Sequence, residues 1–379
     1  MLRLHLALAI AGLLARVPPS RAEPAEGEPL PARPALRYSP RPAGEARQWQ
    51  ARVRAELSSL LQLDDLLSAR QSLALEPVIL GSEDRAGYRL QEVEIRSTAA
   101  RTIRLLVTLP EPGAGRPAPA VVCIHGHGGD RRSVHDEGSI YKGFAAALAG
   151  RGFVTGAADV GQHEVYEPGR TLMGERLWDL TRCVDYLASL DAVDSSRIGC
   201  AGLSLGGEMA MWLGAMDPRI AATVSSGFLT MMDQMESNHC LCWKFPGLRE
   251  RVDFPDIYSL IAPRPLQCQN GLREDRTQFY VPLARQAMAE ILPAYRDLGA
   301  PDAAALDVHD GGHEIDLPAL LAFLETHLQP GALAAAPAAG RQPGGPAPSP
   351  RRRGRTGRSA SRPPPARSRY RAAGGARAL

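Results

Sequence analysis

A serine flanked by glycines, Gly202-Leu203-Ser204-Leu205-Gly206, lies between a short apolar run and a stretch of helix-forming residues. The apolar run at residues 198–201 predicts a buried strand, and residues 208–213 favour a helix. Only a very tight turn fits between the two, and glycine leaves room for it. A helix that begins just after the serine also directs unpaired N–H groups at a reacting oxygen. The pattern predicts that Ser204 is a nucleophile.

A second glycine-rich segment, His125-Gly126-His127-Gly128-Gly129, follows a β-rich run at residues 120–124. A loop of this kind at the end of a strand brings backbone N–H groups close to a reacting oxygen. We expect an oxyanion hole formed by the backbone N–H groups of His127 and Leu205. Their side chains need not be polar, because only the main chain donates.

A base for the serine is expected near the end of the chain, because a hydroxyl at its free pKa is a poor nucleophile. The segment Asp307-Val308-His309-Asp310-Gly311-Gly312-His313-Glu314 offers two histidines. His309 falls inside a strand pattern, whereas His313 lies in the glycine-flanked loop that follows. We therefore take His313 as the base and His309 as its rival.

The three glycine-rich segments resemble the dienelactone hydrolase and acetylxylan esterase branch of the α/β-hydrolases, as does Ala262-Pro263-Arg264-Pro265. The resemblance covers about residues 88–328. It implies that Ser204 and His313 belong to a catalytic triad. Dienelactone hydrolases use a cysteine nucleophile, so the serine in this chain favours ordinary carboxylic esters.

The acid of the triad is expected after the strand predicted at residues 265–269, where Glu274 and Asp275 compete. Glu274 stands three residues after Gly271, the usual spacing of the acid in this fold. Deacetylases of this branch usually have aspartate there. We take Glu274 as the acid and keep Asp275 as the alternative.

Strand and helix patterns alternate from residue 120 onward, and the strands are continuously apolar. Such alternation implies an α/β fold, with a mainly parallel sheet covered by helices on both faces. We expect the α/β-hydrolase fold, with Ser204 at the carboxyl end of a central strand, where such sheets bind ligands. Residues 229–259, rich in Met and aromatic side chains, interrupt the alternation. These residues either pack under a loop or form a wall of the substrate site.

Composition divides the chain into four parts. Residues 1–22, with an apolar stretch and small residues before residue 23, are typical of a secretory signal peptide. We expect a lead-in and helix over residues 23–86, the α/β-hydrolase domain over residues 87–329 and a disordered Ala/Pro/Gly/Arg-rich tail over residues 330–379. The protein is expected to be secreted or periplasmic, with a cytoplasmic location as the alternative.

The six cysteines do not make a disulfide framework in a chain of 379 residues. Asn238-His239-Cys240-Leu241-Cys242 places three potential metal ligands within four residues, but a fourth ligand and the usual CxxC spacing are missing. We expect a packed loop or a local disulfide there, and neither a metal nor a cofactor. His125 and His127 are not expected to form a metal pair, because alternate residues of the loop point apart.

We expect hydrolysis of carboxylic esters through an acyl-serine intermediate, with a carbohydrate ester or a small acetyl ester as substrate. No nucleic acid is expected as a partner, because the positive net charge comes from arginines of the tail. A peptidase of the prolyl oligopeptidase type is one alternative. About 65 residues lie between residue 22 and the first predicted strand, and these are too few to form the propeller of such enzymes. A non-catalytic binding module is another, but it has no need for the serine, the histidine and the glycine loop together.

Overall fold

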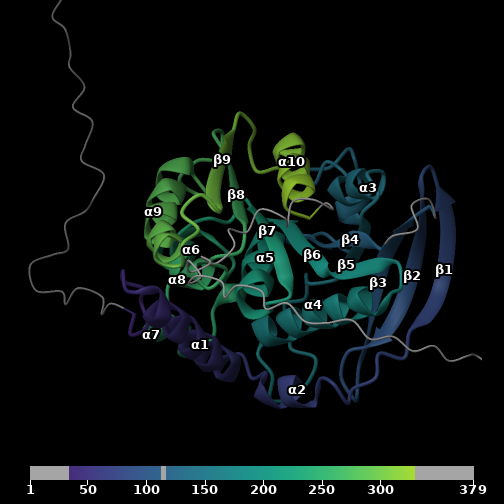
Figure 1. The fold of residues 1–379 in the computed structure, drawn as a ribbon, viewed down its shortest axis with the longest axis horizontal. Helices are drawn as coiled ribbons and strands as arrows, with labels where there is room; N and C mark the ends of the chain where they lie inside the picture. The colour runs from purple at the N-terminus through teal and green to yellow at the C-terminus, as the bar shows by residue number, and fades with distance from the viewer. Residues whose placement is uncertain (1–33, 112–116, 329–379) are drawn as a thin grey trace, which may run out of the picture. The chain divides into compact units, whose positions relative to one another are not determined.

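The computed structural model of the protein describes residues 34–111 and 117–328. Within them, nine strands form one sheet in the order β1-β2-β3-β5-β4-β6-β7-β8-β9 (Figure 1). The pairs β1–β2, β2–β3 and β3–β5 are antiparallel, and the remaining neighbouring strands are parallel. The expectation of a mainly parallel sheet is therefore confirmed. The signal peptide expected at residues 1–22 and the tail expected at residues 330–379 lie outside the described residues.

The elements follow one another in the alternation that the sequence predicts. The strands are β1 (Val78–Arg85), β2 (Tyr88–Arg96), β3 (Thr102–Pro110), β4 (Ala118–Ile124), β5 (Val154–Ala158), β6 (Val193–Leu203), β7 (Ile220–Ser226), β8 (Leu266–Gly271) and β9 (Ala304–His309). The α-helices are α1 (Ala43–Leu60), α2 (Asp64–Ala69), α3 (Phe144–Ala149), α4 (Leu172–Ser189), α5 (Leu205–Met216), α6 (Met232–Asn238), α7 (Leu248–Arg251), α8 (Phe254–Ser259), α9 (Val281–Asp297) and α10 (Leu317–Leu328). Two short 3₁₀ helices are η1 (Ser133–His135) and η2 (Leu241–Trp243).

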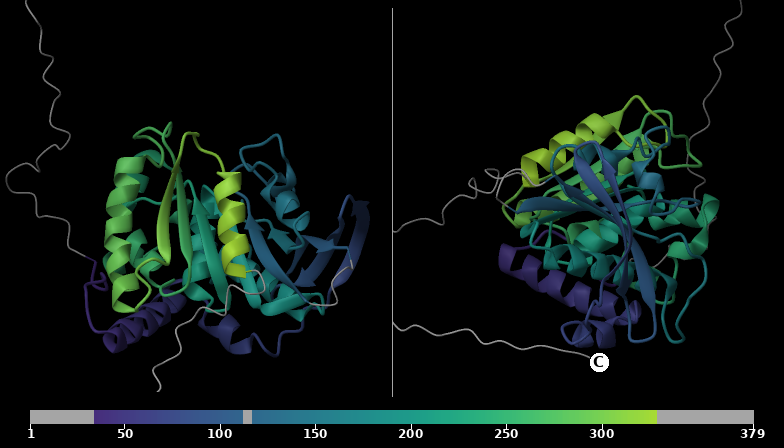
Figure 2. Two further views of the ribbon diagram at one scale, coloured as in Figure 1. Left: turned by 45° about the horizontal axis from the view of Figure 1, so that its top comes forward. Right: turned by 90° about the vertical axis from the view of Figure 1, so that its right-hand side faces the viewer.

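Strand β4 shows why helices cover both faces of the sheet. Successive side chains of a strand point to opposite faces. Val122 and Ile124 pack into a core with residues of α4 and α5, whereas Val121 and Cys123 pack into a second core with residues of α3 and α10. All four are fully buried. Figure 2 shows the yellow-green α10 lying across one face of the sheet. A strand that is apolar on both faces therefore occupies the middle of the sheet.

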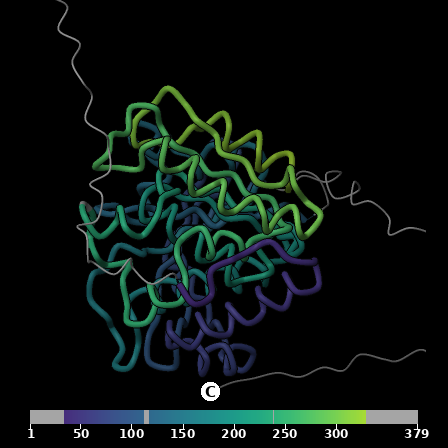
Figure 3. Tube along the Cα trace, turned by 90° about the vertical axis from the view of Figure 1, so that its left-hand side faces the viewer, coloured from purple at the N-terminus to yellow at the C-terminus, as the bar shows by residue number. Residues whose placement is uncertain are grey.

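The N-terminal helix α1 belongs to the same core as the sheet. Its Trp49, Val53 and Leu57 are buried and cluster with residues of α5, α8 and α9. The chain ahead of α1 is held by the Leu36 N–H, which donates to the carbonyl oxygen of Arg251 at 2.8 Å. Figure 3 shows this purple segment running beside the green one. From residue 34 onward, this N-terminal segment is thus packed against the rest of the fold.

The sheet also begins earlier than expected, because β1 lies ahead of residue 87 and pairs with β2. Every residue of β1 is exposed, so its sequence needs no alternation of apolar and polar residues, the pattern that predicts a half-buried strand. No helix among the residues that the structure describes has the length and apolarity needed to cross a membrane.

The stretch at residues 229–259 forms α6, η2, α7 and α8. Met232, Trp243 and Phe254 from this stretch are buried in the main core. A capping box at Asp253 and Asp256 starts α8, since each carboxylate accepts from the backbone at the other end of the turn. Packing under a loop therefore explains most of the apolar side chains of this stretch.

Candidate active site

Ser204 lies alone between the end of β6 at Leu203 and the start of α5 at Leu205. Its backbone has φ 64° and ψ −125°, which is strained for a residue with a side chain. The flanking glycines make this turn fit. A Cβ atom on Gly202 would lie 2.3 Å from the carbonyl oxygen of Gly206, far inside van der Waals contact. The structure thus forms the tight strand-to-helix turn that the sequence predicts.

The loop after β4 lies directly against this turn. A Cβ atom on Gly126 would lie 3.0 Å from the Cβ atom of Ser204, and the Gly126 N–H donates to the hydroxyl of Tyr141 at 2.7 Å. The next residue is His127. Among the described residues, no acceptor pairs with the backbone N–H of His127 or of Leu205. Both N–H groups are therefore available to a bound oxygen near Ser204.

His125 has a structural place below this loop. Its Nε2 accepts from the Val160 N–H at 3.0 Å, so Nδ1 carries the proton and donates to the Gly126 carbonyl oxygen at 2.9 Å. Burial lowers the pKa of His125, which favours this neutral form. His125 is fully buried and His127 is exposed, so the two rings point apart, as the sequence suggests.

Glu274 and His313 form a direct pair at the ends of β8 and β9. The Nδ1 atom of His313 lies 3.0 Å from Oε2 of Glu274. The Glu274 carboxylate also accepts from the backbone N–H groups of Gly271 at 3.3 Å and Phe279 at 3.2 Å. It is almost fully buried, with 5% of the residue exposed. A carboxylate fixed in this way holds the imidazole in the tautomer with the proton on Nδ1.

Asp275, the alternative acid, is turned toward its own loop. It is exposed, and its carboxylate accepts from the backbone N–H of Thr277 at 2.8 Å and from the Thr277 hydroxyl at 2.6 Å. These bonds lower the pKa of Asp275. Of the two carboxylates, Glu274 is the one that the structure brings against His313.

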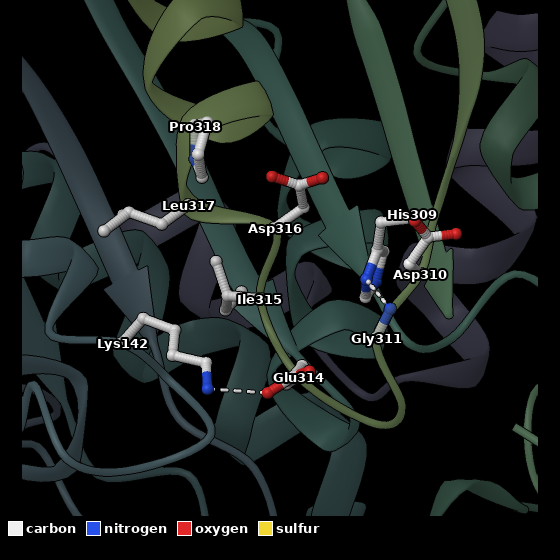
Figure 4. A pocket seen from close by; sticks show the side chains of 9 residues that line it. All are labelled: Lys142, His309, Asp310, Gly311, Glu314, Ile315, Asp316, Leu317 and Pro318. Atoms are coloured by element: carbon white, nitrogen blue, oxygen red, sulfur yellow. Dashed lines mark hydrogen bonds and ion pairs between the residues drawn. The ribbon is translucent and has the colours of Figure 1, made fainter. Parts of the chain in front are cut away.

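His309, the rival histidine, lines a different hollow of about 410 Å³ (Figure 4). Its Nδ1 accepts from the Gly311 N–H at 3.1 Å. An ion pair of 2.6 Å between Lys142 and Glu314 borders the same hollow. Neither Ser204 nor His313 lines it. The structure therefore separates His309 from the serine.

His313 reaches the neighbourhood of Ser204 across strand β7. The Ser204 N–H donates to the carbonyl oxygen of Ser226, the last residue of β7, at 2.9 Å. A Cβ atom on the next residue, Gly227, would lie 2.8 Å from Cε1 of His313. Phe279 stacks on the His313 ring, with centroids 5.6 Å apart, and lines a pocket with Ser204. Ser204 follows β6, Glu274 follows β8 and His313 follows β9, so the three residues lie at the same carboxyl edge of the sheet.

The pocket at Ser204 is small, with a volume of about 60 Å³. Ligand pockets for larger molecules measure roughly 300–1,000 Å³. Its lining residues are His127, Ser204, Leu205, Glu208, Phe228, Met235, His239, Cys240, Cys242 and Phe279. Met235 and three further members of this set belong to residues 229–259, so that stretch also walls the pocket. Cys240 and Cys242 are free cysteines.

Two charged residues under the pocket were not expected from the sequence. Glu208 on α5 is buried beside the pocket, and burial raises its pKa to about 8, although the Arg176 guanidinium opposes the shift. Arg176 on α4 is itself fully buried. Glu208 is the one charged residue in the otherwise apolar α5, which is a signal that could have drawn attention to it. Arg176 has no such signal, because α4 carries several other charged residues.

Known proteins are similar to parts of this chain. The model of the prolyl oligopeptidase family matches residues 144–260, which contain Ser204. Over 173 residues the chain is 31% identical to "Putative hydrolase YtaP" of Bacillus subtilis (strain 168). That match covers 39% of this chain and 58% of the relative, so the chain spans little more than half of the relative's length.

Solved structures are similar over more of the chain. A "putative acetyl xylan esterase" from Bacteroides fragilis has a TM-score of 0.61 and 21% identity, with 72% of this chain and 78% of that chain covered. A glucuronoyl esterase from Solibacter usitatus has a TM-score of 0.59 and 17% identity, with 79% and 99% covered.

The sheet order, the strained serine turn and these likenesses define an α/β-hydrolase fold. The solved structures, at 21% and 17% identity, share this fold with the chain.

The raised pKa of Glu208 predicts a pH-dependent stability. The folded protein holds the Glu208 proton up to about pH 8, whereas the unfolded chain releases it near the ordinary value of 4.5. Unfolding therefore releases a proton between these values, and the free energy of unfolding falls as pH rises through this window. We expect Glu208→Gln to flatten this decline, measured by urea denaturation between pH 5 and about pH 8. Glu45→Gln, at an exposed position of α1, should leave the wild-type slope unchanged. An unaltered slope in Glu208→Gln would contradict the assignment.

Proposed function

We propose that the protein is a serine hydrolase that cleaves carboxylic esters of carbohydrates or of small molecules, with acetyl as the acyl group. One observation carries the proposal. The strained Ser204 shares a sheet edge with a His313 whose Nδ1 is held at 3.0 Å by the buried Glu274. This order of serine, acid and histidine along the chain is the one found in α/β-hydrolases.

The three side chains take distinct roles in this proposal. Ser204 Oγ attacks the ester carbonyl carbon while His313 Nε2 accepts its proton. Glu274 keeps the proton of the neutral ring on Nδ1 and stabilises the imidazolium that forms. His313 then donates the proton to the leaving alcohol, and an acyl-serine remains. Water, deprotonated by the same histidine, releases the acid and restores Ser204.

The oxyanion of each tetrahedral intermediate would be bound by the backbone N–H groups of Leu205 and His127. Leu205 is the first residue of α5, so its N–H has no acceptor within the helix. The positive end of the α5 dipole adds to the stabilisation of the developing charge. Removal of one such donor costs about 10²–10³ in kcat in a well-studied hydrolase.

The small pocket supports a short acyl group. Its volume of about 60 Å³ is enough for an acetyl group and too small for a long chain or a large amino-acid side chain. This favours ester hydrolysis over peptide hydrolysis of the prolyl oligopeptidase type, the second candidate, which the match to residues 144–260 supports. Residues 34–77 include α1 and α2, which pack on the core and provide no propeller blade.

A panel of nitrophenyl esters and acetylated sugars tests the proposal. Acetyl esters should exceed octanoyl esters about 10-fold or more in kcat/KM, because extra methylenes meet the closed wall of the pocket. Met235→Ala, which removes part of that wall, should narrow the difference. Met231→Ala is the matched control, since Met231 lies in the same segment but does not line the pocket.

The nucleophile is checked on the same panel. Ser204→Ala should lose several orders of magnitude in kcat and retain the melting temperature of the wild type. A fluorophosphonate probe should add one label per chain, absent in Ser204→Ala by intact mass. Labelling of a different serine, or cleavage of peptides but of no ester, would refute the proposal.

The acid is tested by a matched pair of neighbours. Glu274→Gln keeps the size of the side chain but cannot stabilise the imidazolium, so kcat should fall on the order of 10⁴-fold. Asp275→Asn should stay near wild type, because its carboxylate bonds only within its own loop in the structure. The opposite result would assign the acid to Asp275. Steady-state kinetics with circular dichroism as a folding control makes the comparison.

We further propose that the protein is exported, to the periplasm or the medium. The support is the signal-like pattern of residues 1–22, with small residues before residue 23. N-terminal sequencing of the protein from cells that express the full chain should show a start near residue 23. A mature protein that retains residues 1–22 in the cytoplasm would contradict export.

A further inference from the structure

We propose that His127, His163, Cys240 and Cys242 bind one zinc ion, or a divalent transition metal of similar ligand preference, beside the pocket of Ser204. Their four ligand atoms all lie within 4.8 Å of one another. Two thiolates and two imidazoles are a donor set that suits tetrahedral Zn²⁺. This site goes beyond ester hydrolysis, and it departs from the metal-free protein expected from the sequence.

The geometry is close to that of a tetrahedral site. Nε2 of His127 lies 3.1 Å from Sγ of Cys242, and the ring centroids of His127 and His163 are 5.3 Å apart. With Zn–N near 2.0–2.1 Å and Zn–S near 2.3 Å, the ligand atoms of a regular site lie about 3.3–3.8 Å apart. The widest pair must therefore approach by about 1 Å. His163 and Cys240 are exposed, so rotation of their side chains can supply this movement.

Arg176 donates hydrogen bonds to two of the segments that carry the proposed ligands. Its Nη1 donates to Sγ of Cys242 at 3.5 Å, and its Nη2 donates to the carbonyl oxygen of Gln162, the residue before His163. One fully buried guanidinium thus contacts two of the segments that carry ligands. Hydrogen bonds from outside the ligand set commonly orient metal ligands in this way.

The binding reaction balances in charge. The dication displaces one proton from each of the thiols of Cys240 and Cys242, and both protons go to solvent. The two thiolates neutralise the metal, while His127 and His163 bind as neutral rings.

The site differs from the cluster that the sequence suggests. His239 stands next to Cys240 in the chain, but its ring packs against Phe279, with centroids 4.8 Å apart, and it is not a member of the group. The histidines come instead from the loop after β4 and from the loop after β5. The metal would therefore join three segments that are distant in the sequence.

A bound metal would also hold the loop that carries the oxyanion donor. His127 contributes its ring to the proposed site and its backbone N–H to the oxyanion hole. His127, Cys240 and Cys242 also line the pocket of Ser204. The effect on turnover rests on the proposed ester hydrolysis, whereas metal binding itself does not.

The test uses the full chain, reduced and freed of metal under anaerobic conditions, then loaded with Zn²⁺ or Co²⁺ and dialysed. We expect about one metal per chain by elemental analysis, and for Co²⁺ the visible absorption of a tetrahedral site with thiolate-to-metal charge transfer. His163→Ala and Cys240→Ser should each weaken Zn²⁺ binding by at least about 10–100-fold, the loss known for outer partners of metal ligands. A competing chelator measures the affinity.

Two histidine variants serve as matched controls for metal binding. His239→Ala removes the sequence neighbour of Cys240, and His327→Ala removes a histidine of α10; both should retain about one metal per chain. Zn²⁺ bound equally by wild type, His163→Ala and Cys240→Ser would overturn the proposal, and so would the absence of stoichiometric binding to the wild type.

Turnover of acetyl esters separates the two proposals. Removal of the metal from the wild type should lower kcat about 10–100-fold, with recovery on addition of Zn²⁺. If the protein binds one metal and the probe labels Ser204, but kcat is the same with and without the metal, the metal site stands. The proposed effect of the metal on the oxyanion loop is then refuted. A protein that binds the metal and hydrolyses no ester would refute only the esterase.

Discussion

The close approach of the carboxyl ends of β4 and β6 is the constraint on which the site depends. A Cβ atom on Gly206 would lie 2.2 Å from the carbonyl oxygen of Ile124, and one on Gly126 would lie 2.8 Å from that of Leu203. Only glycine at these positions lets the two strands and the start of α5 pack at this distance. The same packing fixes the strained backbone of Ser204 between them. It thereby sets where Ser204 lies relative to the backbone N–H groups of His127 and Leu205.

A second close approach, between the loops after β8 and β9, places Glu274 and His313. A Cβ atom on Gly271 would lie 2.3 Å from the carbonyl oxygen of Gly312, and the Arg273 N–H donates to the carbonyl oxygen of Gly311 at 3.0 Å. Because parallel strands end at the same edge, the two pairs of loops face each other there. Side-chain chemistry at this edge is therefore set by backbone packing at a few glycines.

The sequence predicts the sheet and the serine turn well because buried parallel strands and glycine-flanked turns follow from local patterns. Strand β1 escapes prediction because all of its residues are exposed. The choice between Glu274 and Asp275 depends on which carboxylate turns inward, and adjacent residues of a loop leave no periodicity to decide it. In the structure, the N–H and hydroxyl of Thr277 donate to the Asp275 carboxylate, which therefore turns toward its own loop.

The cluster of His127, His163 and the two cysteines lies beyond any local pattern, because it forms only when two strand-end loops meet the segment from Cys240 into η2. Two of the four residues, His127 and His163, come from distant parts of the chain, and His239 next to Cys240 is not among the four. Spacing rules describe ligands within one or two short segments, and they fail when three separate segments supply the residues.

Beyond the edge of the sheet, backbone hydrogen bonds no longer hold the chain, and side chains must position the loops around the pocket. On one side Glu274 does this, since its carboxylate joins His313 to the backbone of its own loop. On the other side Arg176 joins the loop after β5 to Cys242, which in turn contacts His127. That second chain of contacts ends on the half-buried thiol of Cys242 and the exposed imidazole of His127, which hold a loop weakly by themselves. A metal bound there would hold this side of the pocket as firmly as Glu274 holds the side of His313.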